Sequence, residues 1–430
     1  MERKIVNKLL EWKNSPRRMP LIVTGARQVG KTYSLLNFGK QHYKNTVYLN
    51  FENNAALHQL FVRDLNPVRL LRELSAHTGE TILKTDTLLF FDEIQTCERA
   101  LTSLKYFQEQ TPEYQIVSAG SLLGVTFNRQ SFSFPVGKVD RLQVYPLDFE
   151  EFLWALGRKS GIELIRECFE RNEPFASHDV YLDLYKIYLL VGGMPQVVNE
   201  YVVNPDFNRI LDLQKNINDA YIADMAKYAE STETNRILAA YHSISAQLAK
   251  ENRKFQYRII KSGARATMFE NALDWLKTAG IIYKCVKITA GKFPLDLYAE
   301  HDYFKVYLSD AGLLSSKYNL PPHILQSEYS GFENVKGALA ENFVLSSLII
   351  NGYTPFYWES QGKAEVDFVF QNRNGEIIPI EVKSSENTRS KSLNQYIVRY
   401  KPPYSIRAST KNFGFENNLK SIPLYAAFCI

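Results

Sequence analysis

A short stretch near the N-terminus combines glycines, a lysine and a hydroxyl at a spacing that suits phosphate binding. Residues 25–32 read Gly-Ala-Arg-Gln-Val-Gly-Lys-Thr and match the pattern G-x-x-x-x-G-K-[ST]. In such a loop the backbone N–H groups face a polyphosphate, the lysine reaches the β- and γ-phosphates, and the hydroxyl ligates Mg²⁺. The pattern therefore predicts a nucleoside triphosphate site, with ATP as the expected ligand, made by Gly25, Ala26, Arg27, Gln28, Val29, Gly30, Lys31 and Thr32.

Two adjacent carboxylates form a second candidate for the same site. Residues 87–93 read Thr-Leu-Leu-Phe-Phe-Asp-Glu, an apolar strand that ends in Asp92 and Glu93, which is the form of a Walker B element. We expect Asp92 to hold Mg²⁺ and Glu93 to orient and polarise the water that attacks the γ-phosphate. A solvated acidic turn is the alternative, and the neighbouring phosphate loop favours the functional interpretation.

A third group of reactive side chains lies near the C-terminus. Residues 365–370 alternate as a strand, residues 372–375 form an Asn-Arg-Asn-Gly turn, and residues 376–383 continue to Glu381 and Lys383. Side chains at i and i+2 of a strand share a face, so Glu381 and Lys383 point together and Asp367 can face them across the ladder. Two carboxylates and a lysine at one sheet edge can bind Mg²⁺ and activate water for attack on a phosphodiester.

The elements that position the first two groups predict an α/β domain. The apolar runs at 21–23, 45–51, 87–92 and 114–121 suit a parallel sheet covered on both faces, and ligands gather at the carboxyl ends of such strands. We expect this P-loop NTPase core to occupy residues 1–145. Residues 146–231 have apolar residues at helical spacing and predict a helical lid.

Residues 232–318 predict a winged helix: two helices and then a two-stranded ribbon around Gly291. Basic residues cluster in this segment, which suits a phosphate backbone and makes DNA the expected partner; they are Lys250, Arg253, Lys254, Arg258, Lys261 and Arg265. A surface that packs on the ATPase core or on a protein partner is an equally weighted alternative.

The composition excludes several classes of protein. The chain has 430 residues, so it exceeds one hydrophobic core, and its net charge of +5 makes no polycation. The four cysteines are far apart and have no metal-ligand spacing. Apolar segments are too short to span a membrane, and the first residues do not form a signal peptide, so we expect a soluble, cytoplasmic protein.

Several of these segments resemble one large family of prokaryotic AAA+-type ATPases. The matching stretches are residues 21–32, 90–95, 118–121, 142–153, 191–195, 336–344 and 380–383. The resemblance implies ATP hydrolysis and a γ-phosphate sensor at Ser118 or Ser121, with Ser121 taken as the binding residue. Relatives carry Gly-Arg where this chain has Gly137-Lys138. Arg141 or Arg129 could supply an arginine finger, and each could equally be a surface arginine, so the oligomeric state stays open.

The C-terminal group resembles the PD-(D/E)xK nuclease fold, with Asp367, Glu381 and Lys383 at its motif positions. The resemblance adds Glu341, on a preceding helix, as a further acid, so the implied metal ligands are Glu341, Asp367 and Glu381. We expect this α/β domain to occupy residues 319–430. Basic residues and tyrosines alternate between Lys383 and Lys411, which suits a nucleic-acid backbone or an ordinary basic surface.

Two hypotheses about function follow. In the first, the chain is an ATP-dependent enzyme that acts on DNA, with a Mg²⁺-dependent nuclease at its C-terminus. In the second, it is a nucleotide-controlled switch in which the nuclease-like fold is a non-catalytic interaction module that contacts a protein partner. Both require the phosphate loop, and they differ in the role of Asp367 and Lys383.

Overall fold

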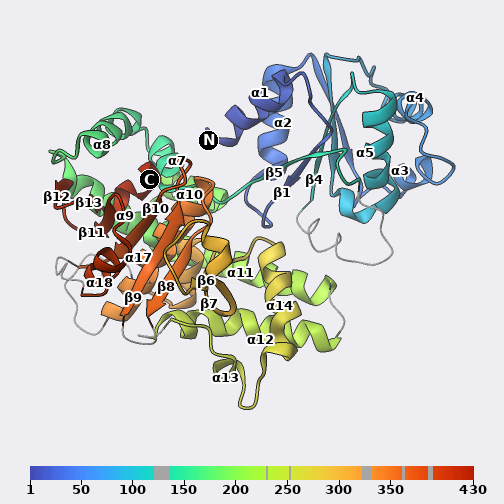
Figure 1. Cartoon of the computed structure of the whole chain (residues 1–430). Helices are drawn as coiled ribbons and strands as arrows, with labels where there is room; N and C mark the ends of the chain where they lie inside the picture. The colour runs from blue at the N-terminus through green and yellow to red at the C-terminus, as the bar shows by residue number, and fades with distance from the viewer. Residues whose placement is uncertain (121–134, 229–230, 251–252, 322–331, 361–363, 386–390) are drawn as a thin grey trace. The chain divides into compact units, whose positions relative to one another are not determined.

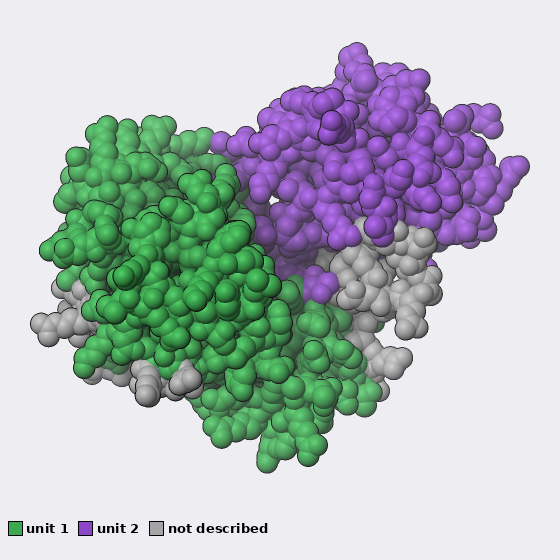
Figure 2. Space-filling view, in the orientation of Figure 1, with its two compact units in different colours: residues 1, 146–277, 281–430 green, residues 2–145, 278–280 purple. Residues whose placement is uncertain are grey.

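The computed structural model describes residues 1–120, 135–228, 231–250, 253–321, 332–360, 364–385 and 391–430. These residues form two compact units, which Figure 2 shows in different colours. The N-terminal unit comprises residues 2–145 and 278–280. The C-terminal unit comprises residue 1, residues 146–277 and residues 281–430. The chain therefore passes between the units after residue 1, at Tyr145–Pro146, and on either side of residues 278–280.

The N-terminal unit is built on a parallel sheet. Its described strands are β1 (Leu21–Thr24), β2 (Asn45–Asn50), β3 (Thr87–Asp92), β4 (Gln115–Ala119) and β5 (Asp140–Gln143), in the order β2-β3-β4-β1-β5. Each pair of neighbours is parallel. All six residues of β3 are buried, as expected for an apolar strand in the middle of a covered sheet. The sequence-based prediction of a P-loop NTPase core is confirmed.

Helices cover both faces of this sheet (Figure 1). They are α1 (Ile5–Asn14), α2 (Lys31–His42), α3 (Ala55–Leu60), α4 (Pro67–Thr78), the 3-10 helix η1 (Ile94–Thr96) and α5 (Glu98–Gln110). Helix α4 shows why the boundaries lie where they do. The Asn66 side chain accepts a hydrogen bond from the Arg69 N–H, Pro67 opens the helix, and Gly79 ends it at φ 74°.

The C-terminal unit begins with helices. They are α7 (Phe149–Ala155), α8 (Lys159–Arg171), α9 (His178–Val191), α10 (Pro195–Val203), α11 (Phe207–Tyr228), α12 (Ser231–Leu248), α13 (Tyr257–Ile260) and α14 (Ala266–Thr278). Gly193, between α9 and α10, accepts a hydrogen bond from the Leu147 N–H at 2.7 Å. A Cβ on Gly193 would lie 1.9 Å from the Leu147 oxygen, so only glycine allows this close approach.

A mixed sheet completes this unit. Its described strands run β12-β13-β11-β10-β9-β8-β6-β7. Their bounds are β6 (Ile282–Ile288), β7 (Ala299–Leu308), β8 (Phe356–Ser360), β9 (Ala364–Gln371), β10 (Ile377–Val382), β11 (Ser405–Ser409), β12 (Gly414–Glu416) and β13 (Leu419–Pro423). The remaining helices are η2 (Leu295–Tyr298), α15 (Ala311–Lys317), α17 (Glu333–Ile350), α18 (Lys391–Tyr400) and η3 (Leu424–Cys429).

The predicted C-terminal hairpin is confirmed. Strands β9 and β10 are antiparallel, with Ile380 opposite Phe368, so Glu381 comes opposite Asp367. Gly375 closes the turn at φ 83° and its N–H donates to the Asn372 oxygen at 3.0 Å. This is the local geometry that the Asn-Arg-Asn-Gly turn predicts.

The predicted ribbon of a winged helix is present, but it is not a free wing. Strands β6 and β7 pair antiparallel, and β6 also pairs with β8 in parallel, with Lys287 opposite Tyr357. The ribbon is therefore the edge of the same sheet that carries the hairpin, and a boundary at residues 318–319 divides one sheet. The correction has a physical reason: the second partner of β6 lies far along the chain, where no local pattern reveals it.

None of the helices in the described part of the chain is long and apolar enough to cross a membrane.

Candidate functional site

The phosphate loop connects β1 to α2 with the backbone that phosphate binding requires. Gly25 has φ 147°, Gln28 has φ 65° and Gly30 has φ 88°. A Cβ on Gly25 would lie 2.3 Å from the Val144 carbonyl oxygen, so this position requires glycine. Helix α2 starts directly after Gly30, and the N–H groups of its first turn have no partner within the helix. Such a helix N-terminus attracts anions.

The side chains of the loop suit a nucleotide with Mg²⁺. The Lys31 ammonium is buried and donates to the carbonyl oxygens of Gly25 and Ala26 at 3.0 and 2.8 Å. The Thr32 hydroxyl donates to Asp92 Oδ2 at 3.0 Å and thus joins α2 to the end of β3. A hydroxyl beside a carboxylate is the donor set that Mg²⁺ prefers. Thr32 and Asp92 would hold the ion, whose chemistry is to neutralise charge on the phosphates.

A tyrosine that the motifs do not reveal orients Asp92. The Tyr48 hydroxyl, on the neighbouring strand β2, donates to Asp92 Oδ2 at 2.9 Å. Asn50 in turn donates to the Tyr48 hydroxyl at 3.2 Å. The other Asp92 oxygen accepts the Glu93 N–H at 3.1 Å. The register of β2 and β3 places Tyr48 beside the end of β3, so a pairing prediction could have found it.

Glu93 has the environment expected of a general base. Its backbone has φ 50°, a conformation that is rare outside glycine and that concentrates at functional sites. The Gln95 amide donates a hydrogen bond to its carboxylate. Burial raises the pKa of Glu93, and the Asp92 charge raises it further, while the bond from Gln95 acts in the opposite direction. A carboxylate with a raised pKa is a better proton acceptor near neutral pH.

The two sensor candidates have different outcomes. The Ser118 side chain is buried within the sheet and donates to the Leu21 carbonyl oxygen at 3.2 Å. Ser118 pairs with Ile22, in the middle of β1. Ser118 therefore lies short of the carboxyl end of the sheet, where β1 leads into the phosphate loop. The alternative assignment to Ser118 is therefore not supported. Ser121 lies outside the described residues.

Of the residues considered for an arginine finger, Lys138 and Arg141 lie within the described part of the chain. Lys138 forms an ion pair with Glu109 at 3.3 Å. Arg141 is exposed on β5, and Arg129 lies outside the described residues.

A buried arginine links the loop to the end of the N-terminal unit. Arg3 donates to the Val29 carbonyl oxygen at 3.0 Å and to the Tyr145 carbonyl oxygen at 2.8 Å. The Val144 N–H donates to the Thr24 oxygen at 2.8 Å, which fixes the last residues of this unit against the start of the loop. The sequence offers no signal for Arg3, because its partners are far away along the chain.

The C-terminal acids also gather in space. Glu381 Oε1 forms an ion pair with Lys383 at 2.7 Å. Asp367 Oδ2 accepts the Val382 N–H at 2.8 Å, and Asp367 is close enough to hydrogen-bond Glu341, which is buried on α17. The structure thus brings Glu341, Asp367, Glu381 and Lys383 together, as the sequence predicts.

Two cations outside the motif, Arg253 and Lys305, also contact these acids. Arg253 forms an ion pair with Glu341 Oε1, and the Tyr307 hydroxyl donates to Glu341 Oε2 at 2.9 Å. Lys305, 1% exposed, lies 3.8 Å from Glu341 Oε2 and 2.5 Å from Glu365 Oε1. We call Arg253, Lys305, Glu341, Glu365, Asp367, Glu381 and Lys383 the charged cluster.

The pKa values in the charged cluster reflect this pairing. Burial alone would raise the pKa of Glu341, but Lys305 and Arg253 hold it below its ordinary value. Burial and the Glu341 and Glu381 charges raise the pKa of Asp367 well above the usual range. Burial would lower the pKa of Lys383, yet Glu381 raises it, so the lysine remains an ammonium ion.

The acids do not form the metal site expected from the sequence. Within the described ranges, which include all three acids, no group of three or more His, Cys, Asp or Glu side chains is placed to hold a metal ion. The physical reason is that the acids already bond to donors of the protein: Glu341 to Arg253 and Tyr307, and Glu381 to Lys383. The residues present therefore do not fit a catalytic Mg²⁺ in this arrangement.

The basic and aromatic residues predicted to contact DNA divide into two groups. Arg253 and Lys254 form ion pairs with Glu341 and Glu359 inside the C-terminal unit. Lys250, Arg258, Lys261 and Arg265 are exposed. Tyr396, on α18, is fully buried against Trp358, so it is not a ring for base stacking.

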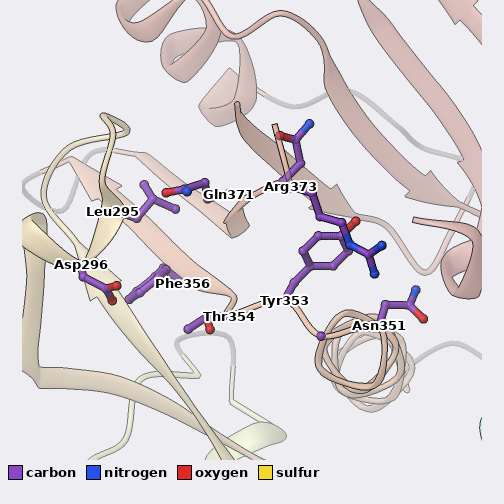
Figure 3. Close-up of a pocket in the computed structure, with 10 residues that line it drawn as sticks. Leu295, Asp296, Asn351, Tyr353, Thr354, Phe356, Gln371 and Arg373 are labelled. Atoms are coloured by element: carbon purple, nitrogen blue, oxygen red, sulfur yellow. The ribbon is translucent and has the colours of Figure 1, made fainter. Parts of the chain in front are cut away.

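A separate cavity of about 310 Å³ opens in the C-terminal unit (Figure 3). Its walls come from η2, from the segment between α17 and β8, and from the turn between β9 and β10, and they include Asp296, Tyr353 and Arg373. None of the predicted site residues lines it.

Comparisons with known families agree with the fold. Residues 17–153 match the model of an AAA domain (AAA_14), and residues 182–323 and 336–427 match two domains of unknown function, DUF8612 and DUF4143. No curated protein matches the chain.

Solved structures show only remote similarity. A Walker-type ATPase of Pyrococcus abyssi is 16% identical, with 74% of this chain and 95% of that chain covered and a TM-score of 0.44. The Aeropyrum pernix ORC1 protein in complex with DNA is 11% identical, with 76% and 93% covered and a TM-score of 0.28. AMPPCP-bound DnaA from Aquifex aeolicus is 12% identical, with 64% and 86% covered and a TM-score of 0.26. These similarities are too remote to assign a partner.

The parallel sheet, the phosphate loop and the Thr32–Asp92 bond define the N-terminal unit as a P-loop NTPase. The AAA domain match covers residues 17–153, so this part of the chain is an AAA-type ATPase domain.

Proposed function

We propose that this ATPase is a nucleotide-controlled switch, in which the state of the nucleotide in the N-terminal unit sets what the C-terminal unit binds. The observation that carries the proposal is the contact between the phosphate loop and the exit of the N-terminal unit. Arg3 bonds to Val29 in the loop and to Tyr145 at the exit, and Gly25 packs against Val144. A shift of the loop on hydrolysis is therefore transmitted directly to the residue that precedes the C-terminal unit.

The first residues of the C-terminal unit are held equally firmly. The Leu147 N–H donates to the Gly193 oxygen at 2.7 Å, and the Leu147 oxygen accepts a hydrogen bond from the Tyr188 hydroxyl at 2.6 Å. Asp148 forms a capping box with Glu151 at the start of α7. The residues on either side of the Tyr145–Pro146 junction are thus hydrogen-bonded within their own units. This supports a mechanical role for the junction.

In the proposed hydrolysis site each residue has one task. The loop N–H groups and Lys31 would bind the phosphates, Thr32 and Asp92 would hold Mg²⁺, and Glu93 would accept a proton from the attacking water. The sensor role remains with Ser121 as a sequence-based proposal.

DNA is the ligand that we propose for the C-terminal unit. Arg258, Lys261 and Arg265 are exposed around α13 and the start of α14, where they can contact phosphates. The exposed side of α14 also carries Glu270 and Asp274, which repel phosphates, so the proposed contact is confined to the N-terminal end of that helix. We further propose that the charged cluster supports this fold without cutting DNA, because Arg253 and Tyr307 bond to Glu341 and Lys383 bonds to Glu381 Oε1.

The experiment combines binding and cleavage. Affinity of the full chain for labelled single- and double-stranded DNA is measured with ADP and, for Glu93→Gln, with ATP. We expect the affinity to depend on the nucleotide, to fall when Arg258 and Lys261 become alanine, and no cleavage with Mg²⁺ or Mn²⁺. Equal affinity in all nucleotide states contradicts the switch.

The same experiment tests the nuclease hypothesis. Cleavage by the wild type that Asp367→Ala and Lys383→Ala both abolish would replace the switch proposal with a Mg²⁺-dependent nuclease. Absence of DNA binding in every state would leave a protein partner as the ligand.

A further inference from the structure

The charged cluster contains its own cations at the place where a nuclease of this layout would bind a metal ion. Its acid groups come from three elements of the C-terminal unit: Glu341 from helix α17, Glu365 and Asp367 from strand β9, and Glu381 from strand β10. Figure 1 shows these three elements in the same part of that unit. Arg253, Lys305 and Lys383 provide three cationic groups against them. A set of buried acids without cations would be costly, because unpaired charge is disfavoured in a low-dielectric interior.

The Arg253 guanidinium is held by its ion pair with Glu341, while its Nε atom has no hydrogen-bond partner among the described residues. Arg253 lies on the segment between α12 and α13. This segment pairs with β7 through an antiparallel β-bridge of Lys254 and Lys305 and through a hydrogen bond of 2.8 Å from the Phe255 N–H to the Phe304 oxygen. On the opposite side, a Cβ on Gly337 would lie 2.5 Å from Arg253 Nη2. Glycine in the interior of α17 costs helix stability, and here it makes the room that the guanidinium occupies.

One acid of the charged cluster is incompletely bonded. Glu381 is 4% exposed, and its Oε2 atom has no hydrogen-bond partner among the described residues. Buried carboxylate oxygens are normally bonded, so Glu381 Oε2 is an acceptor that an ion could use once a cation of the cluster is removed. It distinguishes the charged cluster from an ordinary closed network of ion pairs.

We propose that Arg253 and Lys305 are built-in cations that replace a divalent metal ion in the charged cluster, and that removing the Arg253 guanidinium opens a metal site there. The inference rests on the proposed function in one respect, the non-cleaving role of the cluster. Wild-type protein then binds no divalent ion at Glu381, and the Arg253→Ala protein binds one through Glu341, Asp367 and Glu381. Hard carboxylate oxygens select ions such as Mg²⁺ and Mn²⁺.

The test measures Mn²⁺ binding to the full, nucleotide-free chain by electron paramagnetic resonance, with Asp92→Asn in every protein to silence the ATPase site. We expect Arg253→Ala to bind Mn²⁺ at least about tenfold more tightly than the parent, in a manner that adding Glu381→Gln abolishes. Arg253→Gln removes the charge and keeps a polar side chain, so we expect it to bind Mn²⁺ as well. Arg258→Ala, an exposed arginine nearby, is the matched control and should bind like the parent.

Two results overturn the proposal. The first is Glu381-dependent Mn²⁺ binding by the parent itself, which is measurable even if a variant fails to fold. The second is folded Arg253→Ala and Arg253→Gln proteins that bind Mn²⁺ no more tightly than the parent. Neither result depends on nucleotide or DNA, so a failure of this proposal is distinguishable from a failure of the switch.

Discussion

Arg3 donates a 3.0 Å hydrogen bond to the carbonyl oxygen of Val29, so a residue at the very start of the chain holds the phosphate loop in place. Arg3→Ala removes this bond, and a hydrogen bond from a charged donor is worth roughly 1.5–3 kcal/mol. We expect ATP affinity to fall by about tenfold or more, with partial recovery in Arg3→Lys, as measured by binding of a fluorescent ATP analogue. Arg18→Ala is the control, because Arg18 bonds to Lys13 away from the loop. An unchanged affinity in Arg3→Ala would show that the bond does not support the loop.

The two central residues of the hydrolysis site should separate binding from chemistry. Lys31→Ala removes the ammonium from the loop and should abolish ATP binding. Glu93→Gln keeps the shape of the side chain but removes the proton acceptor, so kcat should fall by about 10² or more while ATP still binds. Phosphate release and nucleotide binding measure the two effects, and Glu98→Gln serves as an acidic control. A Glu93→Gln protein with wild-type kcat would exclude Glu93 as the base.

The rate of ATP hydrolysis should fall on the acid side of neutrality. Burial and Asp92 raise the pKa of Glu93, and only the deprotonated carboxylate accepts a proton from water. As the pH falls through this raised pKa, Glu93 becomes protonated and kcat decreases. Gln95→Ala removes a bond that lowers the pKa of Glu93, so its acid limb should move to higher pH. The kcat–pH profiles of the two proteins measure this, and a shift to lower pH would be the contrary result.

Tyr48 should act on the metal requirement through Asp92. Tyr48→Phe deletes the hydroxyl that bonds to Asp92 Oδ2 and leaves the ring. We expect the Mg²⁺ concentration for half-maximal ATPase activity to rise several-fold, while ATP binding without Mg²⁺ stays the same, because Tyr48 positions a metal ligand. Tyr114→Phe, whose ring packs against the core of the same unit, is the matched control. A lower kcat with an unchanged Mg²⁺ requirement would argue for a purely structural role.

Local patterns predicted most of the N-terminal fold and the hairpin of the C-terminal unit. The apolar run at 87–92 and the turn at Asn372–Gly375 each contain the information for their own structure, because the relevant hydrogen bonds are between near neighbours. The edge ribbon was different: β6 pairs with β8, and Lys287 meets Tyr357 across a long separation in sequence. No periodicity within residues 282–308 distinguishes a free wing from the edge of a larger sheet.

The candidate sites divide in the same way. Lys31, Thr32, Asp92 and Glu93 follow from fixed spacings, and the Thr32–Asp92 bond agrees with the roles those spacings imply. Arg253 could not be predicted as a partner of Glu341, because the sequence shows only that it belongs to a basic segment. Basic clusters suggest phosphate contacts, but here tertiary structure uses Arg253 and Lys254 for internal ion pairs.

The account requires that the nucleotide in the N-terminal unit changes the C-terminal unit. Hydrogen–deuterium exchange of the full chain tests this without a partner, by comparing Glu93→Gln with ATP and the same protein with ADP. We predict changed exchange in residues 146–204, next to the Tyr145–Pro146 junction, and loss of that difference in the Arg3→Ala background at saturating nucleotide. Identical exchange throughout residues 146–430 in both nucleotide states, with a difference confined to the N-terminal unit, would contradict the switch.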